Sequence, residues 1–217
     1  TAAGGLVGEV AQVWKPKQTN TFETDWGYSC MGYEISGARG IKMAKPKQEV
    51  VVFVGDGSYL LNNSDIYSSI LYEKKLIIVI CDNSGHMVIN RLQLAKGGKE
   101  YLCNLKTSRV TNFIEVDFAA HAASMGAETE TVTSTSELES AFLRAKKSNK
   151  TYVIALKTHG YEWLEGTAFW ESPTLEVSST DNNKKAYEEH REGKEKQNHL
   201  YHLMKPKINK VKNFCLK

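Results

Sequence analysis

Apolar residues occur along this chain in short continuous runs, and each run stops at a glycine or a polar side chain. Residues 49–54 read EVVVFV and stop at Gly55, and residues 76–81 read LIIVIC and stop at Asp82. A third run, TYVIALKT, covers residues 151–158. Runs of four to eight β-branched and other apolar residues are typical of buried β-strands. The pattern therefore predicts three strands in the core.

The spacing of apolar residues becomes helical between the first two runs. In residues 62–75, Ile66 and Ile70 lie four positions apart, as on one face of an amphipathic helix. A strand–helix–strand unit of this kind makes its two strands parallel. Because strands and helices alternate along the chain, we expect an α/β fold with a doubly wound parallel sheet. Residues 84–112 show little periodicity and are expected to be rich in loops.

Polar residues mark further element ends in the second half of the chain. Asp117 is expected to cap a helix that ends at Gly126. Residues 128–134 (ETETVTS) are expected to form a short strand. Ser136, with Glu139 three positions later, is expected to form a capping box that opens the next helix.

Oxygen-bearing side chains follow the first two predicted strands. Asp56 offers a carboxylate, Asn83 an amide oxygen, and a main-chain carbonyl near Gly85 is a third candidate ligand. The carboxyl ends of parallel strands lie at one sheet edge, where ligands of open α/β sheets bind. Three oxygen ligands suit Mg²⁺ or Ca²⁺ better than Zn²⁺. Gly57 and Ser58 offer N–H groups at a helix start, which favours an anion. The sequence therefore predicts a diphosphate held through a divalent cation.

The Gly-Asp-Gly-Ser at 55–58 and the Asp-Asn at 82–83 together resemble the cofactor-binding motif of the thiamine-diphosphate-dependent enzymes. Most members have Asn-Asn at the second place, and Gly-Asp-Gly alone would also fit a plain turn after a strand. The resemblance implies a thiamine-diphosphate-binding fold over residues 1–180. It implies these site residues: Asp56, Asn83 and the Gly85 carbonyl as Mg²⁺ ligands, and Gly55, Gly57, Ser58 and Gly85 against the cofactor.

Residues 27–43, GYSCMGYEISGARGIKM, resemble the segment that precedes Gly-Asp-Gly in these enzymes. Met31 matches the side chain that lies between the two rings of the cofactor, and its unbranched, polarizable thioether suits that place. The carbonyl of Ser29 would accept a hydrogen bond from the pyrimidine amino group. The alternative is a closely packed helix with Met31 in its core.

Longer stretches resemble the ring-opening hydrolases of inositol catabolism within this family, over roughly residues 4–200. That resemblance implies hydrolysis of a carbon–carbon bond in a small cyclic dione derived from a polyol, with 5-deoxy-glucuronate as product. The loop after Asn83 departs from the usual Gly- and Phe-rich sequence, and His86 there is a candidate substrate contact. His159 is a second candidate, in a cluster whose aromatic residues could instead pack on a partner subunit. The cluster also contains Glu162, Trp163, Glu165 and Trp170.

The activating Glu of this family lies in a pyrimidine-binding domain of a second subunit, and no segment here matches that domain. We therefore expect the catalytic Glu to lie outside this chain, a homo-oligomer, and no activity from the chain alone. Because the sequence begins with Thr1 rather than Met, we expect it to be part of a longer protein. Two alternatives stay open: an acetohydroxyacid-synthase-like carboligase or decarboxylase, and a truncated, non-catalytic binding module.

Composition is that of an ordinary globular protein, with 41% apolar and 24% charged residues among 217. No apolar run approaches the ~20 residues of a membrane span, and no signal peptide is recognisable. The four cysteines are scattered, which fits the reducing cytoplasm, and Cys30 and Cys81 are expected to be buried.

The tail, residues 181–217, has nine Lys and one Arg against one Asp and four Glu, so its net charge is +5 and that of the remainder is −2. Both signs alternate at helical spacing, which is typical of a solvated helix, and no aromatic platform for nucleic acid accompanies them. We expect a charged helical tail that is unassigned from residue 201, and neither nucleic-acid nor membrane binding.

Overall fold

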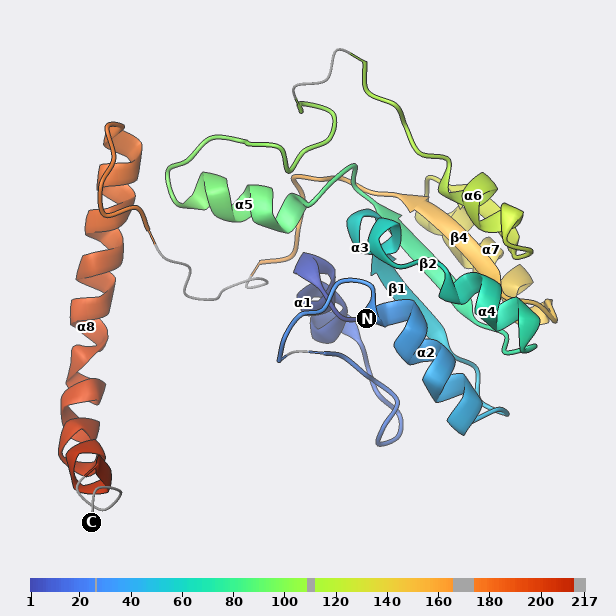
Figure 1. The fold of residues 1–217 in the computed structure, drawn as a ribbon, viewed down its shortest axis with the longest axis horizontal. Helices are drawn as coiled ribbons and strands as arrows, with labels where there is room; N and C mark the ends of the chain where they lie inside the picture. The colour runs from blue at the N-terminus through green and yellow to red at the C-terminus, as the bar shows by residue number, and fades with distance from the viewer. Residues whose placement is uncertain (26, 109–111, 166–173, 213–217) are drawn as a thin grey trace. The chain divides into compact units, whose positions relative to one another are not determined.

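Four parallel strands form one sheet in this protein (Figure 1). The computed structural model describes residues 1–217 except 26, 109–111, 166–173 and 213–217, and no side chains from residue 198 onward. The strand order is β1-β2-β4-β3, and the predicted strands are all present. Their bounds are Val51–Gly55 (β1), Ile77–Asp82 (β2), Glu128–Val132 (β3) and Tyr152–Lys157 (β4).

Helices connect and flank these strands. Their bounds in the described part are Gly4–Val13 (α1), Tyr33–Ala44 (α2), Asp56–Leu61 (α3), Asp65–Leu71 (α4), Met87–Ala95 (α5), Phe118–Ser124 (α6), Thr135–Lys147 (α7) and Asp181–Lys212 (α8). The nine-residue α5 contradicts the expectation of loop over 84–112. Its buried positions include the polar Asn90, which is 1% exposed, so the apolar periodicity that signals a helix is missing there.

Helices cover both faces of the sheet. One apolar cluster joins β1, β2 and β4 to α2, α3, α4 and α6, and a second joins β2, β3 and β4 to α7. Strand β2 is buried on both sides, as its unbroken apolar sequence predicts. The doubly wound α/β fold expected from the sequence is therefore confirmed.

Two helix starts test the predicted caps. Asp117 accepts a hydrogen bond from Ala120 N–H at 2.9 Å, so the predicted cap of α6 is confirmed. The cap of α7 lies two residues earlier than predicted, because Ser134 accepts a hydrogen bond from the N–H of Glu137. The Glu137 carboxylate accepts from the N–H of Thr133, the residue before the cap. Ser134 and Ser136 are each followed by Glu three positions later, so the local sequence alone does not decide between them.

Cys30 is exposed, and Cys81 is only half-buried. The expectation that both are buried is therefore wrong. Cys30 lies in the segment before α2, in which residues 27–31 are all exposed.

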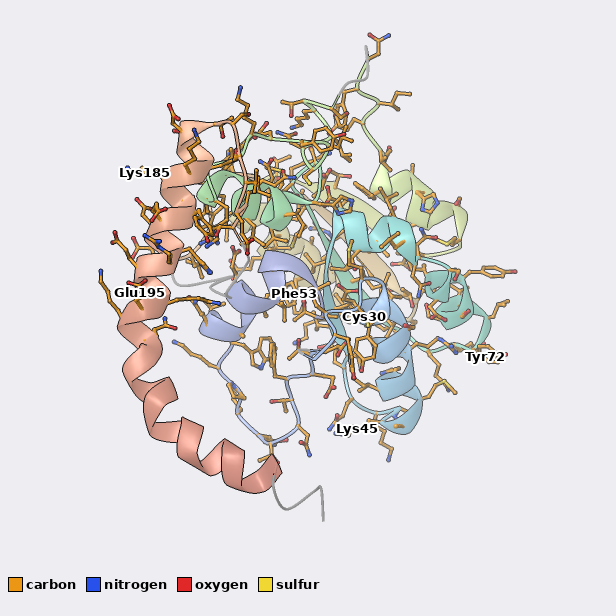
Figure 2. All side chains as sticks on the ribbon, turned by 60° about the vertical axis from the view of Figure 1, so that its left-hand side comes forward. Cys30, Lys45, Phe53, Tyr72, Lys185 and Glu195 are labelled. Carbon is orange, nitrogen blue, oxygen red and sulfur yellow. The ribbon has the colours of Figure 1, made fainter. Side chains whose placement is uncertain are left out.

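Two compact units make up the chain, residues 1–91 with 101–169, and residues 92–100 with 170–217. The second unit contains α8, from which charged side chains such as Lys185 and Glu195 project (Figure 2). The helical tail is confirmed, and the predicted domain boundary at residue 180 stays a prediction. None of the helices in the described ranges has the length and apolarity to cross a membrane.

Candidate functional site

The carboxyl ends of β1 and β2 lie side by side, since the strands are parallel and Gly55 is in register with Cys81. Asp56 follows β1 as the first residue of α3 and is 3% exposed. One of its carboxylate oxygens, Oδ2, accepts a hydrogen bond from the N–H of Gly85 at 2.8 Å, and the other accepts from the N–H of Gly57 at 2.9 Å. The carboxylate thus joins the loops that follow the two strands.

Gly85 has no room for a side chain. A Cβ there would lie 2.1 Å from the carbonyl oxygen of Cys103, on a segment that the neighbouring His86 N–H also binds at 2.8 Å. Glycine is therefore required for the loop to bring its N–H to Asp56. The ligand role predicted for the Gly85 carbonyl stays a prediction.

Asn83 directly follows the last residue of β2. Its Oδ1 atom is buried and has no hydrogen-bond partner among the described residues. Buried polar atoms in native proteins are nearly always paired, so this amide oxygen has its acceptor capacity unused by the described residues.

Burial raises the pKa of Asp56 to about 7; the N–H groups of Gly57 and Gly85 oppose this shift, and the charge of Asp82 adds to it. A divalent cation would stabilise the ionised carboxylate. Nowhere in the described ranges do three or more His, Cys, Asp or Glu side chains gather as a metal site. A site here would therefore be of the carboxylate–amide type and would need further oxygen ligands from water or phosphate.

Asp82, the neighbour of Asn83, has further partners besides the carboxyl group of Asp56. Its Oδ2 atom lies 2.6 Å from Nζ of Lys157, and its Oδ1 atom accepts from the N–H of Ser84 at 3.0 Å. Lys157 also pairs with Glu115. Partial burial lowers the pKa of Lys157, but its bonds to the two carboxylates raise it by more. The ammonium thus neutralises one of the two buried carboxylates at this edge.

Met31 and His86 both lie against Gly57. A Cβ on Gly57 would be 2.6 Å from two ring atoms of His86 and 3.5 Å from Cε of Met31. Met31 is 39% exposed, so it is not a core residue as the alternative interpretation required. The structure thus brings the predicted wedge residue and the predicted loop histidine to the same glycine.

The N–H groups predicted to face an anion are those of Gly57 and Ser58, and that of Gly57 already has a protein partner. The N–H of Gly57 donates to Asp56, and the hydroxyl of Ser58 donates to the carboxylate of Glu34. Ser29 lies in an exposed segment with a φ of +51°, and the role predicted for its carbonyl stays a prediction.

A cavity of about 420 Å³ adjoins Asn83. Its lining includes Met87, Arg91, His159 and Trp163, and the guanidinium of Arg91 lies 4.3 Å from the centre of the Trp163 ring. His159 therefore shares a cavity with Asn83, whereas His86 is not among the lining residues. Of the remaining cluster, Trp170 lies outside the described residues.

A protein-family model described as "Thiamine pyrophosphate enzyme, C-terminal TPP binding domain" matches residues 2–156. The chain belongs to this family. The family resemblance drawn from the sequence motifs is therefore confirmed, and the site at the carboxyl edge is part of a TPP-binding domain, TPP being thiamine diphosphate.

Relatives of this TPP-binding domain carry a consistent name, 3D-(3,5/4)-trihydroxycyclohexane-1,2-dione hydrolase. The protein from Halalkalibacterium halodurans is 38% identical over 193 residues, which are 86% of this chain and 30% of that protein. The relative from Listeria monocytogenes serovar 1/2a is 40% identical over 190 residues, 87% and 30% of the two chains. The relative from Bacillus subtilis is 37% identical over 193 residues, which are 86% of this chain and 29% of that protein. The chain thus spans about 30% of the length of these relatives.

A solved structure shares the fold of the domain. The thiamine diphosphate-dependent 4-hydroxybenzoylformate decarboxylase of Rhodococcus jostii RHA1 matches with a TM-score of 0.53 and 20% sequence identity, over 59% of this chain and 23% of that one. At this identity the likeness concerns the fold alone.

One residue near the site escaped the sequence analysis. Glu34 is 3% exposed, and its carboxylate contacts both Gly32, which follows Met31, and Ser58, which follows Asp56 and Gly57. A single Glu in a helix that also carries Arg39 and Lys42 gives no sequence signal, because surface helices commonly contain such residues.

Proposed function

We propose that this chain is the diphosphate- and metal-binding part of a thiamine-diphosphate-dependent hydrolase that opens the ring of trihydroxycyclohexane-1,2-dione by cleaving a carbon–carbon bond. The observation that supports it most is the unpaired, buried Oδ1 of Asn83, at the same sheet edge as the buried carboxylate of Asp56. The relatives named above supply the substrate.

The residues at the sheet edge would divide the work of holding the cofactor. Asp56 and Asn83 would bind Mg²⁺, and the metal would hold the diphosphate. Met31 would contact the rings of the cofactor. Bound thiamine diphosphate would supply the chemistry, a carbon centre that attacks a carbonyl and then stabilises the resulting negative charge.

The cavity beside Asn83 would take part of the substrate. His159 lines it together with Arg91 and Trp163, and such polar and aromatic groups suit a small polyhydroxylated molecule. A pyrimidine-binding domain from a second copy of the enzyme would provide the activating Glu, so the complete enzyme would be a homo-oligomer. The chain by itself would bind the cofactor weakly and would turn over no substrate.

The test is calorimetric titration of this chain with thiamine diphosphate in Mg²⁺ and in EDTA. Asp56→Ala and Asn83→Ala should each weaken the Mg²⁺-dependent binding by about 100-fold, since even residues outside the ligand shell of a metal contribute 10–100-fold. Asp117→Ala, which removes a helix-capping carboxylate, is the control and should bind as the original chain does. Equal affinity of all four proteins, or no binding at millimolar cofactor, would contradict the proposal.

A second assay separates hydrolase from carboligase. A protein that carries this chain together with a pyrimidine-binding domain should consume the cyclic dione and form no acetolactate from pyruvate. Acetolactate formation without dione turnover would favour the carboligase instead.

A further inference from the structure

Glu34 is a buried carboxylate at the meeting point of three chain segments. It lies in the first turn of α2 and is 3% exposed. Its hydrogen-bond partners are N–H and hydroxyl donors, and the Thr1 ammonium interacts with its charge. A carboxylate in such a place is costly unless each oxygen is bonded, so its contacts are specific.

The contacts of Glu34 reach the two segments that carry the site residues. The N–H of Gly32 donates to Oε2 at 2.9 Å, and the hydroxyl of Ser58 lies 2.8 and 2.9 Å from the two carboxylate oxygens. The Gly32 N–H also lies 2.8 Å from Oγ of Ser58, so the three groups form a closed set. Hydrogen bonds to an ionised acceptor are about twice as strong as neutral ones.

A third segment joins from the start of the chain. The N–H of Ala3 lies 3.3 Å from Oε1 of Glu34, and Ala3 is the residue that precedes α1. Residues of the first turn of α1, including Gly5, line the cavity beside Asn83. The carboxylate thus joins three segments near the candidate site: the one before α1, the one that carries Met31, and the turn after β1.

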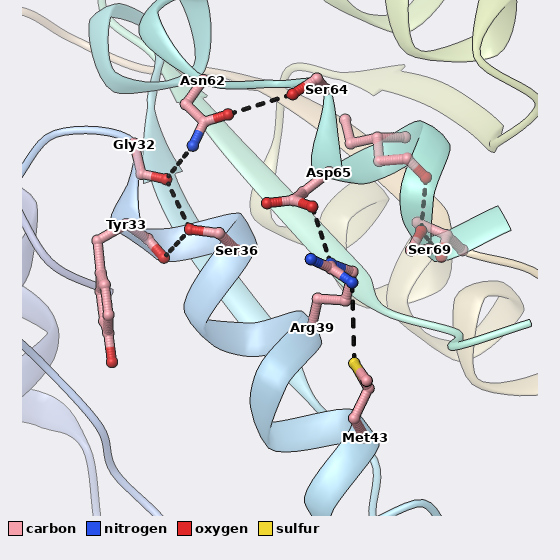
Figure 3. A network of polar contacts seen from close by, with 11 residues as sticks. Gly32, Tyr33, Ser36, Arg39, Met43, Asn62, Ser64, Asp65 and Ser69 are labelled. Atoms are coloured by element: carbon pink, nitrogen blue, oxygen red, sulfur yellow. Dashed lines mark hydrogen bonds and ion pairs between the residues drawn. The ribbon is translucent and has the colours of Figure 1, made fainter. Parts of the chain in front are cut away.

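Gly32 is held on its other side as well. Its carbonyl accepts a hydrogen bond from Nδ2 of Asn62 at 3.2 Å (Figure 3). Its φ is +93°, and a Cβ there would lie 2.6 Å from Cβ of Asn62, so only glycine fits. Gly32 thus donates its N–H to Glu34 and accepts at its carbonyl from Asn62. These two bonds fix the orientation of the peptide units on both sides of Gly32, directly after Met31.

We propose that Glu34 is a positioning residue for thiamine diphosphate: its carboxylate holds Met31 and the Asp56–Gly57 turn in the arrangement that the bent, metal-bound cofactor requires. The inference rests on the proposed function. Glu34 touches neither the metal nor the cofactor in this assignment, and it acts through Gly32 and Ser58. A purely structural Glu34 would stabilise the fold and leave cofactor affinity unchanged.

The experiment compares Glu34→Gln with Glu130→Gln. Glu130 accepts hydrogen bonds from Arg144 at 2.5 Å and from Tyr152 at 2.6 Å, and it lies on β3, the strand at the opposite edge of the sheet from β1. Both variants keep the volume of the side chain and remove a bonded charge. For each, two quantities are measured: the dissociation constant for thiamine diphosphate with Mg²⁺, and the urea midpoint of unfolding without cofactor.

We expect both variants to lower the urea midpoint, but only Glu34→Gln to weaken cofactor binding, by about 10–100-fold as for other residues one contact removed from a metal or ligand. Glu130→Gln should stay within about twofold of the original chain. Equal cofactor affinity in Glu34→Gln and the original chain would overturn the positioning role. If Glu34→Gln does not fold, Ser58→Ala removes one partner only and should still weaken binding at least about threefold; unchanged binding there would overturn the inference.

Failure of the inference and failure of the proposed function give different results. If the original chain shows no Mg²⁺-dependent binding that Asp56→Ala abolishes, the proposed function fails. If it shows such binding and Glu34→Gln binds equally well, only the positioning role of Glu34 fails.

Discussion

The ion pair between Lys157 and Asp82 gives a quantitative prediction about the stability of the sheet edge. Asp82 is 4% exposed at its side chain, and Lys157 is 35% exposed. Unit charges 2.6 Å apart attract by about 3 kcal/mol at an effective dielectric constant of about 40, between a protein surface site and water. Ordering the Lys157 side chain offsets about 1 kcal/mol of that. Lys157→Met should therefore lower the free energy of unfolding by about 2 kcal/mol.

This value is below the roughly 3–5 kcal/mol expected for breaking a fully buried pair, because Lys157 is partly solvated. It corresponds to a fall in melting temperature of about 4–8 °C for a chain of this size. The loss comes mainly from leaving Asp82 buried without its cation, so removing its charge should cancel most of it. In an Asp82→Asn background, Lys157→Met should cost less than about 1 kcal/mol, which gives a coupling energy of about 1–2 kcal/mol.

The assay is urea unfolding followed by far-UV circular dichroism at pH 7 in EDTA, on the original chain, the two single variants and the double variant. Lys146→Met is the control, because Lys146 and Glu49 are 3.9 Å apart and both exposed, and it should change stability by less than about 0.5 kcal/mol. Additive effects of the Lys157 and Asp82 substitutions would refute the reasoning, since they would show that the charges do not interact.

Two further predictions concern other parts of the sheet. The hydrogen bonds from Arg144 lower the pKa of Glu130, so this carboxylate should stabilise the fold above the pKa of an unfolded Glu and lose that effect as the pH falls through the lowered, folded-state pKa. The difference in unfolding free energy between the original chain and Glu130→Gln is measured by urea unfolding from pH 7 to pH 3. It should be about 1 kcal/mol at pH 7 and should shrink in the acid range. A difference that stays constant with pH would contradict a stabilising role for the ionised Glu130 carboxylate. Gly85→Ala should destabilise the chain by more than about 2 kcal/mol in thermal unfolding, because the added Cβ would lie 2.1 Å from the carbonyl oxygen of Cys103. Gly40→Ala is the control. Its Cβ would meet nothing within 4 Å, so this variant should be as stable as the original chain or more stable.

Local sequence patterns predicted the elements whose signals are strong. The unbroken apolar runs became β1, β2 and β4, and the cap at Asp117 was found where expected. Where a signal was duplicated or absent, the prediction was wrong. The cap of α7 is Ser134 rather than Ser136. Helix α5 was expected to be loop because residues 84–112 show little apolar periodicity. Such cases depend on which of several compatible local structures the rest of the fold stabilises.

The sequence by itself determined the chemistry available at the site. The carboxylate of Asp56 and the amide of Asn83, their place after two parallel strands, and the family of the domain all follow from short motifs in a strand–helix–strand unit. These features are local, because each depends on residues within one element and its adjoining turn.

Only the tertiary structure decided which charges are neutralised and which polar atoms are left without a partner. Lys157 pairs with Asp82 because β4 lies next to β2, although 75 positions separate the two residues. Glu34 contacts Ser58 because α2 packs against β1 and brings its first turn to the start of α3. Strand order and helix packing result from burying apolar surface over the whole chain, so no local pattern of residues contains them.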